Sequence, residues 1–439
     1  MHSRSLQLTR TAAMWVWTAP WLCAASLEVT ASHPDAVYTQ GETITWSVAA
    51  KDDPDHTLTR VHYKITRDGA PELKQADLPL KDGTGEIKAT DTQPGVLLVE
   101  LNAGDNGQPK QHLVGGAIID PGKIPRSAPR PADFDAFWNG KLAELAKVPA
   151  NPQLTPGNSG RDGVAYWQIT MDLPREQKVR GHLARPATGA KFPAILMVQY
   201  AGVYGLPPGK ITPQAARGWL VLNISAHDLP IDQPEPFYKD QDAGPLKGYA
   251  MIGNEDREKS YFLRMFLACS RAVDYLASRP DWDGQTLVVT GISQGGLQSI
   301  VAAGLNPKVT ALIVNVPAGC DVTAPLAGRA MPWPYWLKNT DGKDRDAIIR
   351  TSMYFDAQNF APRVKCPALI SFGLLDRTAT ASGVSVMAAQ LAGPVEKLVL
   401  TRSEHQAKGD SQAAFGKRSG EWLNALAATG KPPALTKTR

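Results

Sequence analysis

Apolar residues follow two different spacings along the chain. Between residues 27 and 119, apolar and polar residues alternate in short runs, most clearly at 42–48, 61–65 and 96–101, and turn residues separate the runs. This alternation is typical of half-buried antiparallel strands. We therefore expect a small β-sandwich domain of the immunoglobulin-like kind over residues 27–122.

A different pattern begins after a segment rich in proline. Residues 120–131 contain four prolines, a density typical of a stiff, extended segment, so we place an interdomain linker at residues 123–132. Beyond it, short apolar runs of the buried-strand type alternate with stretches of helical spacing. The predicted strands are 164–171, 178–184, 194–200, 220–225, 287–291, 311–316, 368–373 and 397–401, and the clearest helices are 133–146, 256–278 and 294–303. The alternation predicts an α/β domain with a doubly wound, mostly parallel sheet over residues 133–428.

One short motif carries the strongest chemical signal. Residues 291–296 read Gly-Ile-Ser-Gln-Gly-Gly and stand between a predicted strand and a predicted helix. This is the layout of a nucleophile elbow, in which a sharp turn lifts the serine hydroxyl clear of the sheet. Glycines two places before and after Ser293 fit the steric demand of that turn. The motif predicts that Ser293 is a nucleophile.

A serine hydroxyl needs a base that takes its proton, and the base needs a carboxylate partner. His405 is the only histidine after Ser293, so it is the predicted base, folded back to within bonding reach of the serine. Of the aspartates between them, Asp376 closes the apolar run 367–376, which places it at the carboxyl end of a strand, where such sheets hold their sites. Asp376 is therefore the predicted acid, with Asp356 as the second choice.

With these residues placed, the second domain resembles the acetyl xylan esterase and cephalosporin C deacetylase group of α/β-hydrolases. The resemblance covers residues 130–428. It is carried by Asp-Phe-Asp-Ala-Phe-Trp at 133–138, Arg-Pro-Asp-Trp-Asp-Gly at 279–284 and the elbow itself. It implies an α/β-hydrolase fold and an oxyanion hole made by the backbone amides of Gln294 and Tyr200, which would stabilise the charge that develops on the ester carbonyl.

The chain also departs from the pattern of that family. The family usually carries Arg-Gly-Gln where this chain reads Ala226-His227-Asp228, and usually has Glu after the catalytic histidine where this chain has Gln406. The family forms ring-shaped hexamers, so the resemblance allows a homo-oligomer. His227 lies in a loop that borders the predicted site, and we consider it a substrate contact, with a structural hydrogen-bonding role as the alternative.

An aromatic cluster precedes the predicted acid. Trp333, Tyr335 and Trp336 lie in a connection rich in glycine and proline. Flat aromatic faces suit the apolar faces of sugar rings. The cluster is therefore a candidate for sugar binding, although packing of a lid or of a subunit contact would use the same residues.

Composition and charge restrict the setting. The net charge of +5 over 439 residues is small and the basic residues are scattered, so we expect no nucleic-acid partner. Residues 1–25 combine early arginines, a short apolar stretch and small residues at its end, which predicts a signal peptide and a secreted or periplasmic protein. No apolar run is long enough for a membrane span. Cys269, Cys320 and Cys366 suggest neither a disulfide framework nor a zinc site, and we expect them to be buried.

Together these features predict a serine carboxylesterase that removes acetyl groups from xylan or related plant polysaccharides without metal or organic cofactor. Two alternatives remain open. A serine peptidase of the prolyl oligopeptidase type has the same order of nucleophile, acid and base. A catalytically inert carbohydrate-binding protein would use the sandwich as its working part.

Overall fold

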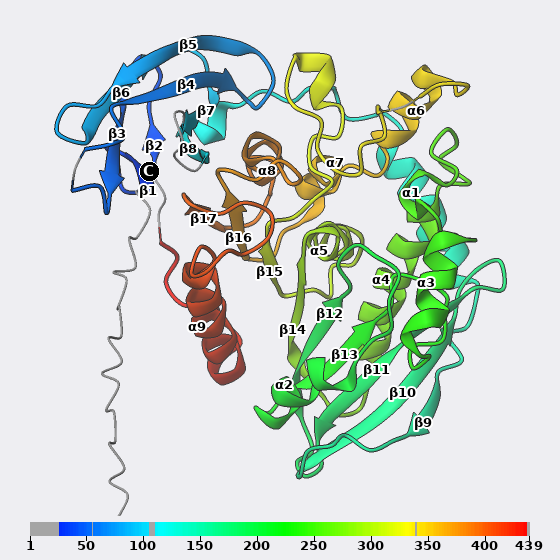
Figure 1. Ribbon diagram of the computed structural model, residues 1–439. Helices are drawn as coiled ribbons and strands as arrows, with labels where there is room; N and C mark the ends of the chain where they lie inside the picture. Colours follow the sequence, from blue (N-terminus) through cyan, green and yellow to red (C-terminus); the bar gives the residue numbers. More distant parts are fainter. Residues whose placement is uncertain (1–25, 55, 105–109, 339, 437–439) are drawn as a thin grey trace, which may run out of the picture.

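The computed structural model describes residues 26–54, 56–104, 110–338 and 340–436, and the signal peptide predicted at 1–25 lies outside these ranges. Figure 1 shows a lobe of strands beside a larger lobe in which helices cover both faces of a long sheet. Within the described residues, no helix has the length and apolar character that crossing a membrane requires.

The smaller lobe is a sandwich of two sheets. One sheet has the order β1-β3-β6, and the other has the order β2-β8-β7-β4-β5. Residues from both sheets, including Trp46, Ile65 and Val99, share one hydrophobic core. The strands are β1 (Ser26–Ala31), β2 (Val37–Tyr38), β3 (Thr43–Lys51), β4 (Arg60–Arg67), β5 (Glu72–Pro79), β6 (Thr84–Thr90), β7 (Gly95–Ala103) and β8 (Gln111–Ile119).

Strand β7 joins the sandwich to the larger lobe because it is buried on both faces. Leu97 and Val99 point into the sandwich core, whereas Val96 and Leu98 belong to the core of the larger lobe. Successive side chains of a strand alternate between its two faces, so one strand serves both cores. Because both faces of the strand are buried here, this part of its sequence is a continuous run of apolar residues. The shared strand packs the two lobes together.

The larger lobe is built on a nine-stranded sheet of described residues, in the order β17-β16-β15-β14-β12-β13-β11-β10-β9. Strands β13, β12, β14, β15, β16 and β17 are parallel, and β9, β10 and β11 form an antiparallel edge. The strands are β9 (Gln153–Pro156), β10 (Val164–Asp172), β11 (Lys178–Pro186), β12 (Phe192–Val198), β13 (Leu220–Ile224), β14 (Trp282–Ile292), β15 (Ala311–Asn315), β16 (Ala368–Gly373) and β17 (Val395–Leu400).

The helices lie on both faces of this sheet (Figure 1). Helix α5 is buried along its whole length and α4 along most of its length, and most of the buried side chains are apolar. The helices are α1 (Phe134–Ala146), α2 (Thr212–Ala216), α3 (Glu235–Ala243), α4 (Tyr261–Ser278), α5 (Gln294–Leu305), α6 (Arg345–Ser352), α7 (Ala357–Phe360), α8 (Ala381–Ala388) and α9 (Ala413–Thr429).

Several elements differ from the sequence-based expectations, and β14, for example, begins at Trp282 and not at residue 287. The helix expected from residue 256 begins at Tyr261, because Ser260 caps it by accepting a hydrogen bond from the amide of Phe262. Strand β9 was not expected. Its side chains are all exposed, so it carries no apolar alternation that a sequence pattern would reveal.

The proline-rich segment is bound to the larger lobe along its length. Ile124 is buried, and the amide of Ser127 donates to Asp321 at 3.1 Å. Arg130 donates to the carbonyl of Asn359 at 2.9 Å. These bonds make the segment a fixed strap between the two lobes, so it does not act as a free spacer.

Candidate active site

Ser293 stands at the sharp turn between β14 and α5. Its backbone has φ 58° and ψ −122°, a conformation that residues other than glycine rarely adopt. A Cβ at position 291 would lie 2.4 Å from the carbonyl carbon of Gly295, and a Cβ at position 295 would lie 2.8 Å from the carbonyl oxygen of Val198. Both positions therefore require glycine, for the steric reason that the motif suggested.

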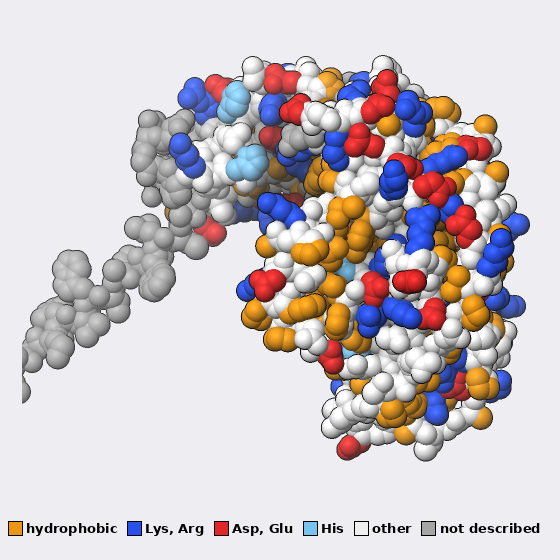
Figure 2. Space-filling view, turned by 90° about the vertical axis from the view of Figure 1, so that its right-hand side faces the viewer, with side chains coloured by type: hydrophobic (Ala, Val, Ile, Leu, Met, Phe, Trp, Pro, Cys, Tyr) orange, Lys and Arg blue, Asp and Glu red, His pale blue; other side chains and the backbone are white. Residues whose placement is uncertain are grey.

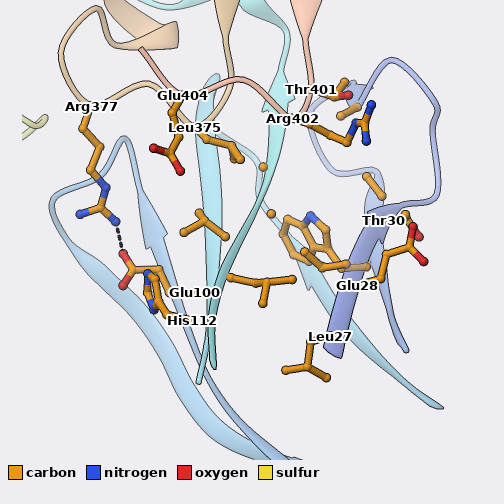
Figure 3. Close-up of a pocket in the computed structure, with 18 of the residues that line it drawn as sticks. Leu27, Glu28, Thr30, Glu100, His112, Leu375, Arg377, Thr401, Arg402 and Glu404 are labelled. Atoms are coloured by element: carbon orange, nitrogen blue, oxygen red, sulfur yellow. Dashed lines mark hydrogen bonds and ion pairs between the residues drawn. The ribbon is translucent and has the colours of Figure 1, made fainter. Parts of the chain in front are cut away.

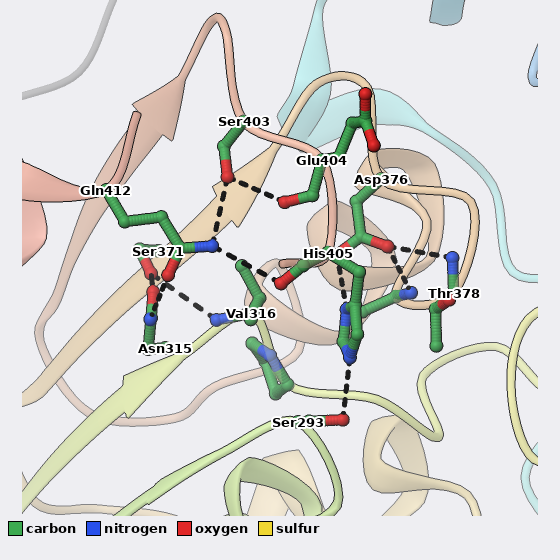
Figure 4. Close-up of polar contacts among 12 residues, drawn as sticks. Ser293, Asn315, Val316, Ser371, Asp376, Thr378, Ser403, Glu404, His405 and Gln412 are labelled. Atoms are coloured by element: carbon green, nitrogen blue, oxygen red, sulfur yellow. Dashed lines mark hydrogen bonds and ion pairs between the residues drawn. The ribbon is translucent and has the colours of Figure 1, made fainter. Parts of the chain in front are cut away.

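The structure brings the three predicted residues together (Figure 4). The Oγ of Ser293 lies 2.8 Å from Nε2 of His405, although 112 residues separate them. On the other side of the ring, Nδ1 of His405 lies 2.7 Å from Oδ2 of Asp376. A carboxylate only accepts hydrogen bonds, so Nδ1 carries the proton and Nε2 is free to accept from the serine hydroxyl.

The acid of this chain of contacts is held firmly in place. The side chain of Asp376 is fully buried. Its second oxygen accepts from the backbone amides of Thr378 at 2.7 Å and Ala379 at 2.8 Å. The neighbouring Arg377 pairs with Glu100 of the sandwich. The carboxylate of Asp376 is thus oriented by backbone amides and directed at the histidine.

A chain of polar side chains supports the loop that holds His405. Gln412 donates to the carbonyl of His405 at 3.3 Å and to the hydroxyl of Ser403 at 3.0 Å. The amide of Gln412 is fixed in turn by Asn315 at 2.8 Å, and Asn315 accepts from Ser371 at 2.5 Å. The sequence pattern did not predict a role for these residues. The only signal was the presence of two polar residues, Asn315 and Ser371, in otherwise apolar buried strands.

The proposed oxyanion donors lie on adjoining segments. Gln294 is the first residue of α5, where backbone N–H groups have no acceptor within the helix. Tyr200 follows β12, and the two segments are tied by Gln298, which donates to the carbonyl of Gln199 at 2.8 Å. The Gln294 side chain accepts from Tyr249 at 2.5 Å. Side chains therefore fix the region, and the two backbone amides stay our candidates for the oxyanion hole.

The structure contradicts the interpretation of His227 as a substrate contact. His227 is only 1% exposed to solvent. One ring nitrogen lies 2.7 Å from the hydroxyl of Tyr261 and the other lies 3.0 Å from the carbonyl of Gly202. Burial lowers the pKa of His227 to about 4. A neutral, fully bonded ring has no polar atom left for a substrate, so His227 instead braces the loop that follows Tyr200.

The aromatic cluster divides into buried and exposed members. Trp336 is buried in the main core, and its indole donates to the carbonyl of Ala250 at 2.6 Å. Its prediction as a sugar platform is therefore wrong. Trp333 is partly buried and stacks on Phe262 with ring centres 5.7 Å apart. Tyr335 is 36% exposed, so it alone of the three presents a face that a ligand could reach with ease.

Asp356, the second choice for the acid, has a structural role. It caps α7 and accepts from the amides of Asp321 at 3.0 Å and Val322 at 2.7 Å. Burial and the neighbouring Asp321 charge raise its pKa to about 7. Its carboxylate is occupied by these donors, whereas Asp376 reaches the histidine.

The three cysteines of the described region are free thiols. Cys269 and Cys320 are buried as expected, whereas Cys366 is partly exposed. Burial raises the pKa of Cys269 and of Cys366 to about 12, so these thiols are poor nucleophiles at neutral pH. Among the described residues, no group of His, Cys, Asp and Glu has the arrangement of a metal site.

Known proteins identify the class of this site. Residues 124–423 match the sequence model of the acetyl xylan esterase (AXE1) family. The chain is also 30% identical to the acetyl esterase Axe7A of Xylanibacter ruminicola over 381 residues, which cover 85% of each protein. The chain belongs to the acetyl xylan esterase family. This membership confirms the predicted resemblance and makes the protein a carboxylic ester hydrolase.

Two solved structures of the acetyl xylan esterase family share the fold. The acetyl xylan esterase from Paenibacillus sp. R4 gives a TM-score of 0.58 at 22% identity and covers 68% of this chain and 96% of its own. Acetyl xylan esterase 1 from Thermoanaerobacterium sp. JW/SL YS485 gives 0.56 at 20% identity, covering 67% and 96%. They confirm the predicted α/β-hydrolase fold.

The sandwich has a different distribution among these relatives. About a third of this chain has no counterpart in either solved esterase. Residues 124–439 make up less than three quarters of the chain, so the alignment with Axe7A, which covers 85% of it, extends into the sandwich. At least one acetyl esterase thus shares sequence with the N-terminal lobe.

Proposed function

We propose that this protein is a serine carboxylesterase that removes acetyl groups from xylan or related plant polysaccharides and oligosaccharides. The observation that carries the proposal is the contact of 2.8 Å between Ser293 and His405, with Asp376 at 2.7 Å on the far side of the ring. Membership of the acetyl xylan esterase family supports the substrate.

The chemistry follows from the protonation state of the ring. Ser293 attacks the ester carbonyl while His405 takes the hydroxyl proton on Nε2, and Asp376 stabilises the imidazolium that forms. The amides of Gln294 and Tyr200 would stabilise the negative oxygen of the tetrahedral intermediate. When that intermediate collapses, His405 returns the proton to the departing sugar oxygen and an acetyl group stays on Ser293. A water molecule, activated by His405 in the same way, then attacks the acetyl group on Ser293 and releases acetate.

We also propose export of the protein by the signal peptide at residues 1–25. A native N-terminus near residue 26 in protein recovered from the medium or periplasm would support this part of the proposal. Recovery of the activity only inside the cell, with an uncut N-terminus, would overturn it.

The test of the catalytic proposal compares Ser293→Ala with Ser419→Ala. Ser419 lies on α9, and within the described ranges its hydroxyl donates only to the carbonyl of Gly416. We expect Ser293→Ala to lose essentially all turnover of 4-nitrophenyl acetate and of acetylated xylan, and Ser419→Ala to match the wild type. Retained turnover in Ser293→Ala would overturn the proposed nucleophile.

The same substrates test the nature of the leaving group. Wild-type protein should release acetate from acetylated xylan and should leave peptide amides uncut. Amine release from peptides with little action on acetate esters would favour a peptidase. Binding of xylan without any ester hydrolysis would favour an inert carbohydrate-binding protein.

A further inference from the structure

A cleft lies at part of the boundary between the sandwich and the catalytic lobe (Figure 3). Its volume is about 820 Å³, which lies within the range of about 300–1,000 Å³ typical of ligand sites. One wall comes from β1 and β8 of the sandwich, and the other comes from the loops that follow β16 and β17. A volume of this size exceeds by far the space that an acetyl group needs.

The cleft borders one residue of the proposed triad, His405, whereas Ser293 and Asp376 are not among the residues that line it. His405 lines it, together with Thr378, whose amide holds Asp376. In the proposed mechanism, His405 must protonate the leaving sugar oxygen, so that oxygen has to lie beside the imidazole. The rest of the leaving carbohydrate therefore extends away from His405, and the cleft begins at this residue.

The walls offer the chemistry that a carbohydrate needs. From the sandwich, Thr30 and His112 supply exposed polar groups beside the apolar Leu27. From the catalytic lobe, Arg402 and Glu404 add donors and acceptors of opposite charge. Sugars present hydroxyls at their edges and C–H groups on their faces, so a wall that mixes polar and apolar side chains suits them.

A buried donor also lies beside the cleft. Trp46 lies on the sandwich wall of the cleft. Within the described part of the chain, its buried indole N–H has no hydrogen-bond partner. Buried donors are almost always paired, so this unpaired one is unusual among the side chains that line the cleft.

The two walls are held at a fixed spacing. Arg377 of the catalytic lobe pairs with Glu100 of β7, and the amide of Ala330 donates to the carbonyl of Asp68 at 3.0 Å. With β7 shared between both cores, the cleft is a preformed feature of the fold. Preformed sites bind with less loss of conformational freedom.

We propose that this cleft binds the carbohydrate chain that carries the ester, so that the sandwich supplies one half of the leaving-group site. This inference rests on the proposed function and assigns the N-terminal lobe a direct part in substrate recognition. The carbohydrate would extend from His405 outward between the lobes and would lie along β1 and β8.

The test introduces a large side chain into the cleft and leaves the three triad residues unchanged. Thr30→Trp fills the sandwich wall, and Thr90→Trp adds the same side chain at an exposed position of β6 in the same sheet, outside the cleft. For each protein, kcat/KM is measured on acetylated xylo-oligosaccharides and on 4-nitrophenyl acetate. We expect the ratio of the two values to fall by about tenfold or more in Thr30→Trp, a change of about 1.4 kcal/mol, and to stay at the wild-type value in Thr90→Trp.

Each outcome bears on a different proposal. An unchanged ratio in Thr30→Trp, or an equal loss on both substrates, would overturn the role of the cleft and leave the esterase proposal intact. If wild-type protein cleaves the small ester and ignores the oligosaccharides, the proposed substrate class fails first.

A smaller change covers the case in which Thr30→Trp does not fold. His112→Ala removes one polar group from the opposite strand of the sandwich wall, and we expect a several-fold higher KM for the oligosaccharides only. The Ser293→Ala protein should bind deacetylated xylohexaose in calorimetry, more weakly when His112→Ala is added. Identical binding with and without that second change would count against the proposal.

Discussion

Arg377, the residue directly after Asp376, forms an ion pair with Glu100 on β7 of the sandwich (Figure 3). The loop that carries Asp376, the hydrogen-bond partner of His405, is therefore tied to the N-terminal lobe. Burial would raise the pKa of Glu100, but the hydrogen bond and charge of Arg377, with a smaller effect of Lys64, keep that pKa below its ordinary value. The pair is the clearest electrostatic link between the proposed acid and the sandwich.

Removal of this ion pair should lower stability in a pH-dependent way. Because Arg377 is 59% exposed, we expect Arg377→Met to reduce the free energy of unfolding at pH 7 by about 1 kcal/mol or less. A carboxyl with a lowered folded pKa stabilises above its ordinary pKa of 4.5 and loses this contribution as pH falls through the folded value. Urea unfolding should therefore show the two proteins converging at acid pH. Lys88→Met, which breaks the exposed pair with Glu86, is the control, and a constant difference at all pH values would contradict this account.

The glycine before the nucleophile should tolerate no side chain. In Gly291→Ala the new Cβ would meet the backbone of Gly295 at 2.4 Å, so we expect the turn to shift, turnover to collapse and unfolding to become easier by about 1–3 kcal/mol. Gly416→Ala on α9 is the matched control, because a Cβ there meets nothing within 4 Å; it should keep full activity. Kinetics and thermal unfolding of both variants test this prediction, and wild-type behaviour of Gly291→Ala would refute the steric argument.

Substitution of Asp376 should reduce turnover, whereas substitution of Asp356 should reduce stability. Asp376→Asn keeps the shape but removes the charge that stabilises the imidazolium, so we expect kcat to fall by about 10³- to 10⁴-fold. Asp356→Asn disturbs the cap of α7 and should cost about 1–3 kcal/mol of stability with near-normal kcat in the folded protein. Steady-state kinetics beside denaturant unfolding would show this. The reverse pattern would make Asp356 the acid.

His227 should make stability depend on pH. Its folded pKa of about 4 lies below the ordinary 6.5, so between these values the unfolded chain binds a proton that the folded protein does not. Stability from this group is complete above pH 6.5 and decreases as pH falls toward 4, by about 3 kcal/mol in total. His227→Gln should flatten the pH dependence of unfolding in this window. A dependence as steep as in the wild type would show that other groups cause it.

Charged side chains of both signs are mixed on one face of the molecule. Figure 2 shows acidic and basic side chains interspersed over the face in view, with no extended area of one sign. A phosphate backbone requires a concentrated basic surface. The face in view has no such concentrated basic surface.

The amino-acid sequence by itself determined the local features of this protein. The spacing of apolar residues predicted most strands of the parallel sheet, because burial on both faces leaves a continuous apolar run. The elbow around Ser293 could be predicted because its steric demand falls on two glycines nearby in the chain. Asp376 could be placed because it follows a strand that the sequence marks clearly.

Contacts between segments far apart in the sequence became visible in the folded structure alone. His227 and Trp336 look available in the sequence, yet neighbours far along the chain bury them and occupy their polar atoms. The support of His405 by Gln412 and Asn315 joins three separate elements. The cleft, too, takes one wall from β1 and β8 and the other from the loops after β16 and β17, which lie far apart in the chain. Burial and hydrogen bonding depend on the complete fold. The local spacing of apolar residues therefore does not predict which distant residues come into contact.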